Sequence, residues 1–200
     1  MNKAVIFDWG GVFMRTTDYT PRHAWDQKLD LPIGSVESTV HGSEIWRAAQ
    51  RGEISLDDYW QQTGLDLSLT PEQTHQLRHD FYSGDTIDTE LVTLLNNLHE
   101  ASIPCGLMSN NSLDLIDTLK IHGLFNLFTA CIISAQIGVM KPSPEAYHAI
   151  LDKMTVSPQN ALFIDDFIEN VEGARKVGMS AIHYTPNLDL KTLIFEWVES

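Results

Sequence analysis

Five short, continuous apolar runs constrain the fold of this 200-residue chain more than any other feature of its sequence. The runs cover residues 4–7, 105–108, 127–133, 161–164 and 180–184. Uninterrupted apolar runs of this length are typical of parallel strands that are buried on both faces. From about residue 88 onward they alternate with helical patterns, such as Leu91, Leu94, Leu95 and Leu98. This alternation predicts an α/β fold, a Rossmann-like doubly wound parallel sheet.

Residues 15–83 show a different pattern, in which helix signals follow one another and no strand-like run occurs. Gly52 ends one predicted helix, Ser55 opens the next with a pattern that resembles a capping box, and Thr70 opens a third. An insertion directly after the first strand is well placed to cover the carboxyl end of that strand. The predicted domains are an α/β core of residues 1–14 and 84–200 and an inserted helical cap of residues 15–83.

The charge balance excludes several classes of partner. The chain has 13 basic and 27 acidic residues, a net charge of −14, which opposes binding to nucleic-acid backbones and anionic membrane surfaces. Its least polar window, residues 127–140, is shorter than the roughly 20 residues of a membrane span. The first residues lack the character of a signal peptide, and two cysteines cannot form a disulfide framework. We therefore expect a cytoplasmic protein with no nucleic-acid or membrane partner, whose oligomeric state the sequence leaves open.

Two groups of polar residues follow the first two apolar runs. Asp8 follows the first run and precedes Gly10 and Gly11, which allow a tight turn and a close approach of the backbone to a ligand. Ser109 and Asn110 follow the second run, where hydroxyl, carboxamide and backbone N–H groups suit the oxygens of a phosphoryl group. Taken alone, the same residues also fit ordinary roles in a turn and a helix cap.

Two further groups of polar residues have the same placement. Lys141 precedes a helix that begins near Pro144, where its ammonium would neutralise an oxyanion and a carboxylate, although a solvated surface lysine is the common alternative. Asp165 and Asp166 end the fourth run and repel each other unless a cation lies between them or one is protonated. Asp166 with Glu169 also fits a capping box. Because open α/β sheets bind ligands at the carboxyl ends of their strands, the four groups together predict metal-assisted phosphoryl transfer through an aspartyl intermediate.

Four motifs occur in an order that resembles the haloacid dehalogenase-like hydrolase superfamily, from Lys3 to about Tyr184. They are Phe7-Asp8, Met108-Ser109-Asn110, Lys141-Pro142-Ser143-Pro144 with Tyr147, and residues 163–166 with Asn170, Gly173, Ala174 and Gly178. Within the superfamily, residues 7–12 and 51–55 most resemble the branch of sugar-1-phosphate phosphatases and the N-terminal phosphatase domain of soluble epoxide hydrolases. The resemblance implies an α/β core and a helical cap that closes over the substrate and excludes water.

The resemblance also implies the role of each residue in the site. Asp8 is the expected nucleophile and a Mg²⁺ ligand, Ser109 binds the phosphoryl group, and Lys141 holds both the phosphate and Asp8. The other expected Mg²⁺ ligands are the Gly10 carbonyl, Asp166 as the main acidic ligand, Asp165 in the neighbouring role and Asn170 at the second acidic position. Whether Asp165 or Asp166 contacts the metal directly stays open.

One position departs from the pattern of the superfamily, whose phosphatases usually carry a proton-donating aspartate two residues after the nucleophile. Here that residue is Gly10, so we expect substrates with acidic leaving groups, or help from water or a cap residue. His23, Arg15 and Asp18 are the nearest substitutes in sequence, and exposed cap residues with no such role are the alternative.

The predicted function is that of a Mg²⁺-dependent phosphatase that acts on a small phosphorylated metabolite such as a sugar phosphate. Two alternatives remain. A haloacid dehalogenase would use Asp8 on carbon without a metal, but such a site would leave the repulsion between Asp165 and Asp166 uncompensated. A catalytically silent protein would keep the fold in order to bind a phosphorylated ligand.

Overall fold

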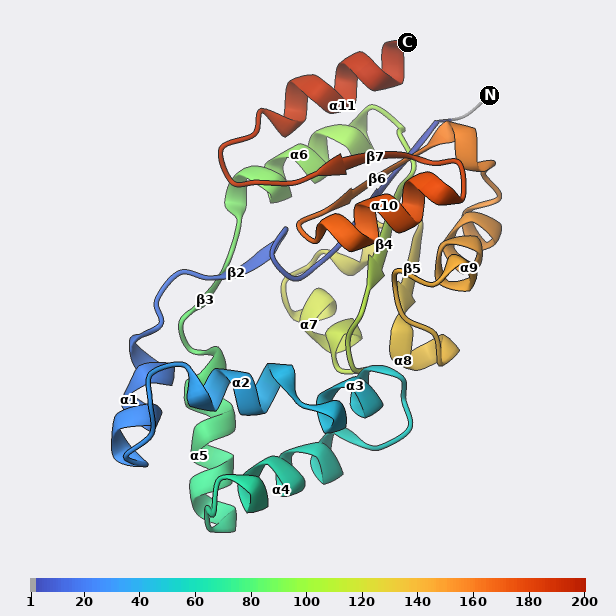
Figure 1. The fold of residues 1–200 in the computed structure, drawn as a ribbon. Coiled ribbons are helices and arrows are strands. Elements are labelled where there is room, and N and C mark those ends of the chain that lie inside the picture. The colour runs from blue at the N-terminus through green and yellow to red at the C-terminus, as the bar shows by residue number, and fades with distance from the viewer. Residues whose placement is uncertain (1–2) are drawn as a thin grey trace.

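The computed structural model describes residues 3–200, and its core is a five-stranded parallel sheet (Figure 1). The strand order is β5-β4-β1-β6-β7. The strands are β1 (Ala4–Phe7), β4 (Cys105–Ser109), β5 (Ala130–Ile133), β6 (Ala161–Asp165) and β7 (Ser180–His183). They coincide with the five apolar runs, except that β5 starts later than predicted because the short 3₁₀ helix η1 (Phe125–Leu127) precedes it. The predicted doubly wound α/β fold is confirmed.

Helices cover both faces of the sheet, and alternate residues of each strand point to opposite layers. Val5 and Phe7 belong to one buried cluster, whereas Ile6 belongs to the other, as the period of two in a strand requires. The first layer contains α6 (Thr89–Glu100), α7 (Leu115–Ile121) and α11 (Leu190–Glu199), and the second contains α9 (Pro144–Met154) and α10 (Ile168–Lys176). Short segments α8 (Ser134–Ile137) and η2 (Pro158–Asn160) complete this part of the chain.

Five helices between β2 and β3 form a separate layer below the sheet in Figure 1. They are α1 (Thr20–Lys28), α2 (Ser35–Gly42), α3 (Glu44–Gln50), α4 (Leu56–Asp66) and α5 (Pro71–Tyr82). Their own buried cluster is rich in aromatic side chains, including Trp25, Tyr59, Trp60 and Phe81. Thr70 forms the predicted capping box, whereas Ser55 caps α4 by accepting a hydrogen bond from the Asp58 N–H and donating its hydroxyl to the Asp58 carboxylate. We call this helical layer the cap.

A two-stranded antiparallel link joins the cap to the sheet, and sequence analysis did not predict it. The link consists of β2 (Met14–Thr16) and β3 (Asp85–Ile87). Both strands have three residues, all half-buried except the exposed Thr86, and are too short to give an apolar run. Two ion pairs hold the link in place: Arg15 of β2 pairs with Asp88 at the start of α6, and Arg22 of α1 lies 2.8 Å from Asp85. The division into a core and a cap domain at these boundaries stays a prediction.

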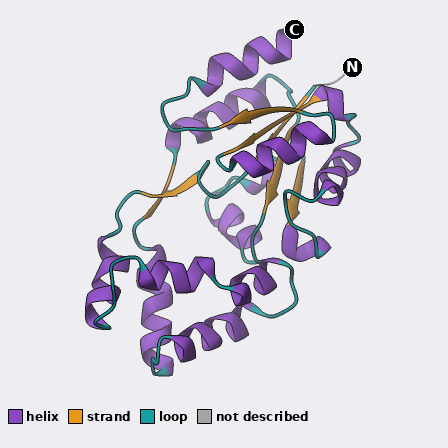
Figure 2. Ribbon diagram, viewed as in Figure 1, coloured by secondary structure: helices purple, strands orange, loops and turns teal. Residues whose placement is uncertain are grey.

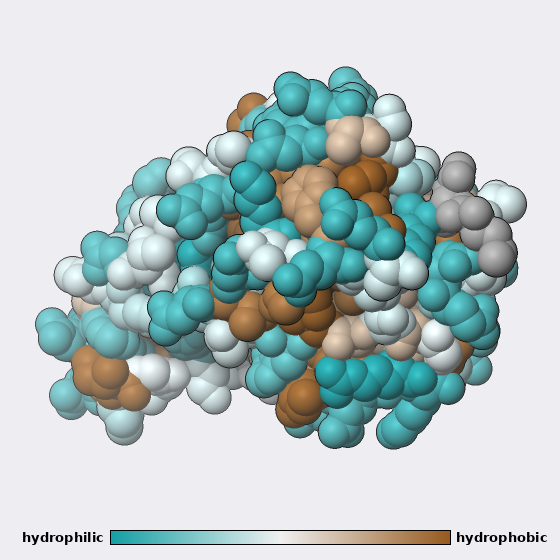
Figure 3. All heavy atoms as spheres, turned by 90° about the horizontal axis from the view of Figure 1, so that it is seen from above, coloured by the Kyte–Doolittle hydropathy of each residue, from teal (hydrophilic) through white to brown (hydrophobic). Residues whose placement is uncertain are grey.

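None of the helices in residues 3–200 has the length and apolar character needed to cross a bilayer. The face in Figure 3 is mostly hydrophilic, with separate apolar areas.

Candidate active site

The carboxyl ends of β1, β4 and β6 meet at the centre of the sheet. β1 lies between the other two strands, and Phe7 is in register with Leu107 of β4 and Ile164 of β6. Asp8, Ser109 and Asp165 therefore leave the sheet from adjacent strands. The arrowheads of β4 and β5 in Figure 2 point toward the cap, so this edge faces the helical layer. The chain order reverses on either side of β1, and such switch points are where open α/β sheets bind ligands.

Lys141 is the buried cation of this edge. Its ammonium nitrogen Nζ lies 2.8 Å from Asp8 Oδ1 and 2.7 Å from Asp165 Oδ2, and it donates a hydrogen bond of 2.9 Å to the carbonyl oxygen of Met108. An ammonium has three N–H donors, so these three acceptors use all of them. The side chain is 1 % exposed, which makes the partners essential because an unpaired buried charge is very costly. Lys141 thus bridges the ends of all three central strands.

The loop before α9 is held in place by Asn110. The Asn110 carboxamide accepts a hydrogen bond of 2.8 Å from the Lys141 N–H and donates one of 2.9 Å to the Lys141 carbonyl. The side chain that the sequence assigned to phosphate binding is therefore occupied with positioning the backbone of Lys141. Ser109 ends β4 and is 3 % exposed, and its backbone is in register with Ile133 of β5.

The two adjacent acids at the end of β6 have different surroundings. Asp165 is fully buried and accepts hydrogen bonds from Phe167 N and from the Asn170 carboxamide, in addition to its bond with Lys141. Asp166 is half-buried, and its Oδ1 is a buried polar oxygen that has no hydrogen-bond partner among residues 3–200. Asp165 is thus fully committed to the protein, whereas Asp166 has an oxygen available for a ligand.

Burial and crowding of negative charge dominate the electrostatics of the site. Burial raises the pKa of Asp8 to about 7; Lys141 opposes the shift and Asp165 adds to it. Burial, with a further contribution from Asp165, also raises the pKa of Asp166. Burial alone would lower the pKa of Lys141, but Asp8 and Asp165 outweigh it and the pKa is raised. The site therefore holds an excess of negative charge around one ammonium.

Three carboxylates of the site are arranged as possible ligands of a cation. One oxygen each from Asp8, Asp165 and Asp166 lies within 4.8 Å of the others. Their three negative charges face the single positive charge of Lys141, so a divalent cation would neutralise the remainder. Carboxylate oxygens are the ligands that Mg²⁺ prefers, and the unpartnered Oδ1 of Asp166 provides one. The residues present fit a magnesium ion.

Gly10 and Gly11, which follow the nucleophile position, have different constraints. Gly11 has φ +73°, a left-handed conformation that favours glycine, and a Cβ there would lie 1.9 Å from Asp166 Oδ2, so a side chain would displace that carboxylate. Gly10 is exposed, and a Cβ there would have no atom within 4 Å. The backbone therefore requires glycine at position 11 but not at position 10.

Comparison with known proteins decides the family. A family model for haloacid dehalogenase-like hydrolases matches residues 2–178, most of the chain. The chain belongs to the haloacid dehalogenase-like hydrolases. The family and enzyme class predicted from the sequence are thereby confirmed.

Similar proteins include named enzymes and a solved structure. The sesquiterpene phosphatase astK of Aspergillus oryzae is 29 % identical over 188 residues, which cover 93 % of this chain and 91 % of that protein. The bifunctional epoxide hydrolase 2 of Sus scrofa is 24 % identical over 90 % of this chain, which spans 36 % of that protein. A HAD family enzyme of Bacteroides thetaiotaomicron, solved with magnesium and inorganic phosphate, has a TM-score of 0.79 and 21 % identity, covering 96 % of this chain and 99 % of that one.

The cap of this hydrolase docks on the core through the end of α3. Gln50 donates its amide N–H to the carbonyl oxygen of Asn110 at 2.8 Å. The Ser134 hydroxyl donates to the Gln50 carbonyl at 2.6 Å and accepts a bond of 3.0 Å from Asn111 N. Gly52 follows, with φ +70°, and a Cβ there would lie 2.4 Å from the carbonyl oxygen of Ala135. The cap is therefore closed against the edge of the sheet that carries Asp8 and Lys141.

The cap residues considered as substitutes for a missing acid are engaged elsewhere. Arg15 is paired with Asp88, and the Asp18 carboxylate accepts a hydrogen bond of 2.9 Å from Thr20 N. The His23 ring stacks on Tyr19, with 5.8 Å between the ring centroids. The structure does not bring these three residues into contact with Asp8 or Lys141.

Sequence reasoning missed several residues at this edge. Ser134 follows β5 and His183 ends β7, so the rule that identified Asp8 and Asp165, polar groups at the carboxyl end of a strand, would have found them too. The Met108 carbonyl and the Gln50 side chain carry no such signal. Their roles depend on contacts between residues far apart in the chain.

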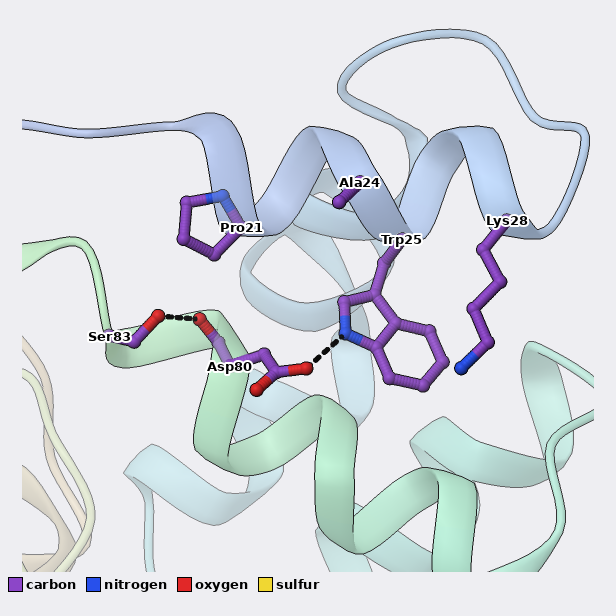
Figure 4. Close-up of a pocket in the computed structure, with 6 residues that line it drawn as sticks. All are labelled: Pro21, Ala24, Trp25, Lys28, Asp80 and Ser83. Carbon is purple, nitrogen blue, oxygen red and sulfur yellow. Dashed lines mark hydrogen bonds between the residues drawn. The ribbon is translucent and has the colours of Figure 1, made fainter.

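A hollow of about 370 Å³ lies on the cap and is separate from the site (Figure 4). It is lined by α1 and the end of α5 and shares no residue with the carboxylate cluster. The indole N–H of Trp25 donates to Asp80 at 3.0 Å, and Lys28 Nζ lies 3.7 Å from the centroid of the Trp25 ring. Its main polar and aromatic groups already bind each other, so we assign it no ligand.

We expect Gly52→Ala to weaken the docking of the cap. The clash with Ala135 would push α3 away from α8 and increase amide hydrogen exchange in residues 44–52 and 134–138, measured by mass spectrometry. Gly123→Ala is the matched control, because Gly123 has φ +71° and an added Cβ there would meet nothing within 4 Å. Both variants carry the cost of a left-handed backbone, roughly 1–2 kcal/mol. Equal exchange in the two variants would contradict docking through Gly52.

Proposed function

We propose that this hydrolase is a Mg²⁺-dependent phosphatase that acts on a small phosphorylated metabolite through an aspartyl-phosphate intermediate. One observation carries the proposal: Asp8 is held by Lys141 in a cluster of three carboxylates, one of which has an unpartnered buried oxygen. A carboxylate, a cation and a metal site at one strand edge are what phosphoryl transfer to an aspartate needs. The phosphatase named among the relatives supports the same class of reaction.

The proposed ligands of Mg²⁺ are Asp8, Asp166 and the backbone carbonyl of Gly10. The bound ion would shield the negative charge of the phosphoryl group and polarise its oxygens. Asp165 does not contact the metal directly in this proposal, because Lys141, Phe167 N and Asn170 already bind its oxygens. Asn170, predicted as a ligand, would act through Asp165 by donating its carboxamide N–H to that carboxylate.

Each residue of the site has a separate role in the proposed reaction. Trp9 N and Lys141 Nζ both bind Asp8 Oδ1, which leaves Oδ2 to attack phosphorus. The new bond from Asp8 to phosphorus forms as the bond to the leaving oxygen breaks, and the electron pair leaves with that oxygen. Lys141 stays beside the reacting centre and neutralises developing charge, and Ser109 binds a phosphoryl oxygen. Water then attacks the phosphorus, releases inorganic phosphate and regenerates Asp8.

The cap has two roles in this proposal. Residues 15–83, as a domain inserted into a core of residues 1–14 and 84–200, close over the site and exclude bulk water during attack by Asp8. The helical cap also selects the metabolite, for which a sugar phosphate is the first class to screen. The cytoplasmic location stays a prediction from the sequence.

The two alternative functions account less well for the carboxylates. A metal-free dehalogenase would leave the negative charge of Asp8, Asp165 and Asp166 opposed by Lys141 alone. A silent protein that binds phosphorylated ligands would need Lys141 and Ser109 but would gain nothing from an aspartate placed to attack. We therefore retain both only as outcomes of the following experiment.

We expect Asp8→Asn to abolish Mg²⁺-dependent release of phosphate from 4-nitrophenyl phosphate, by at least about 10³-fold, because the carboxamide is a poor nucleophile. The size and the hydrogen bond from Trp9 N are preserved by this substitution. Phosphate release at the parental rate would overturn the covalent mechanism. Halide release from 2-haloacids without metal would instead favour the dehalogenase, and neither activity in the parent would favour the silent protein.

Asp166→Asn and Asp165→Asn should have opposite effects on the metal-free protein. Asp166→Asn removes an excess charge and should raise the melting temperature, whereas Asp165→Asn weakens a buried pair with Lys141 and should cost about 3–5 kcal/mol. Mg²⁺ at about 100 times its Kd stabilises a protein by about 2.7 kcal/mol. For a protein of this size that corresponds to a rise of roughly 5–10 °C in the parent. Differential scanning calorimetry with and without Mg²⁺ measures both effects, and a full rise in Asp166→Asn would contradict the assigned metal ligand.

A further inference from the structure

The groups that hold Asp8 have no proton to offer a leaving oxygen. Lys141 uses its three N–H donors on Asp8, Asp165 and the Met108 carbonyl. Asp165 is fully buried and bound on both oxygens. Asp166 is assigned to the metal in the proposed function. None of these groups is placed to protonate the group that departs from phosphorus.

His183 is a further titratable side chain beside the site. Its Nε2 lies 2.9 Å from the backbone carbonyl oxygen of Asp166. A carbonyl oxygen only accepts hydrogen bonds, so the hydrogen on Nε2 is directed to it. His183 therefore acts as a donor to the main chain at the end of β6. Arg15, Asp18 and His23 are engaged in the link and in α1, so these residues do not replace the missing acid.

Position 10 is where this chain has room for a donor and does not carry one. It lies two residues after Asp8, at an exposed turn, and an added Cβ would meet no atom within 4 Å. Its φ lies outside the left-handed region, in contrast to Gly11. A side chain is therefore compatible with both the backbone and the surrounding space, so the absence of one is not imposed by the fold.

We infer, on the basis of the proposed function, that the substrate is a phosphate whose leaving group departs as a stable anion without a proton from the protein. Acyl, anomeric and aryl phosphates have this chemistry, because the electron pair of the breaking P–O bond passes to an oxygen with an acidic conjugate acid. The proton of the attacking water and the proton taken up by the leaving group are exchanged with solvent. Phosphates of simple alcohols, which need a general acid worth about 10² to 10⁴ in rate, are poor substrates.

The test is the dependence of kcat/KM on the acidity of the leaving group, measured with Mg²⁺ on the full chain. The substrates are 4-nitrophenyl, phenyl and ethyl phosphate, whose leaving groups become steadily less acidic. We expect kcat/KM to fall steeply along the series in the parent protein. In Gly10→Asp, a carboxylic acid in the open space should raise kcat/KM for ethyl phosphate by about 10² to 10⁴ and flatten the dependence.

Gly10→Asn is the matched control, because it has the same size but no transferable proton, and it should show no gain. If kcat/KM of the parent protein does not depend on the acidity of the leaving group, the inference is overturned but the proposed phosphatase function is not. This measurement does not require any variant to fold. A steeper dependence in His183→Gln would also overturn it, by identifying His183 as the acid. A folded Gly10→Asp without a gain would do the same. No Mg²⁺-dependent release even from 4-nitrophenyl phosphate would instead overturn the proposed function itself.

Discussion

The buried ammonium of Lys141 is the contact on which the rest of the site depends. An ammonium that is 1 % exposed needs acceptors for its N–H groups, and here three strand ends provide them. β1 provides Asp8, β4 provides the Met108 carbonyl and β6 provides Asp165. The same pairing that stabilises the centre of the sheet therefore fixes the proposed nucleophile. A substitution that removes one acceptor affects both the fold and the chemistry.

The cluster carries more negative charge than Lys141 can neutralise, and this imbalance has a physical consequence. Burial and the proximity of Asp165 raise the pKa of both Asp8 and Asp166, so each of these carboxyl groups in the metal-free site holds a proton to a higher pH than an ordinary aspartate does. A cation that replaces the proton would restore the charged form of Asp8 that attack on phosphorus requires. Repulsion between the carboxylates thus makes the metal-free protein less stable than it would be with fewer charges in the site, a common trade-off between stability and activity.

The sequence allowed the placement of the site to be predicted better than its internal contacts. The apolar runs located the strands, and the rule that ligands bind at their carboxyl ends brought Asp8, Ser109 and Asp165 together. The role of Asn110 could not be predicted, because residue type shows that a carboxamide can donate and accept but does not show that its partner is the backbone 31 residues away. The link strands β2 and β3 were missed for a similar reason: each is stabilised by its partner and by ion pairs, and neither has an apolar pattern of its own.

Asn110 takes part both in the docking of the cap and in the positioning of Lys141, but through different atoms. Gln50 of the cap contacts the carbonyl oxygen of Asn110, whereas the Asn110 side chain binds the backbone of Lys141. In the proposed function the cap opens to admit a substrate. Opening would break the first contact, whereas the two bonds to Lys141 do not depend on it. The charged site would therefore remain preorganised with the cap open, and electrostatic catalysis depends on such preorganisation. The roles that we propose for the cap, exclusion of water and selection of the metabolite, could then change without rebuilding the core.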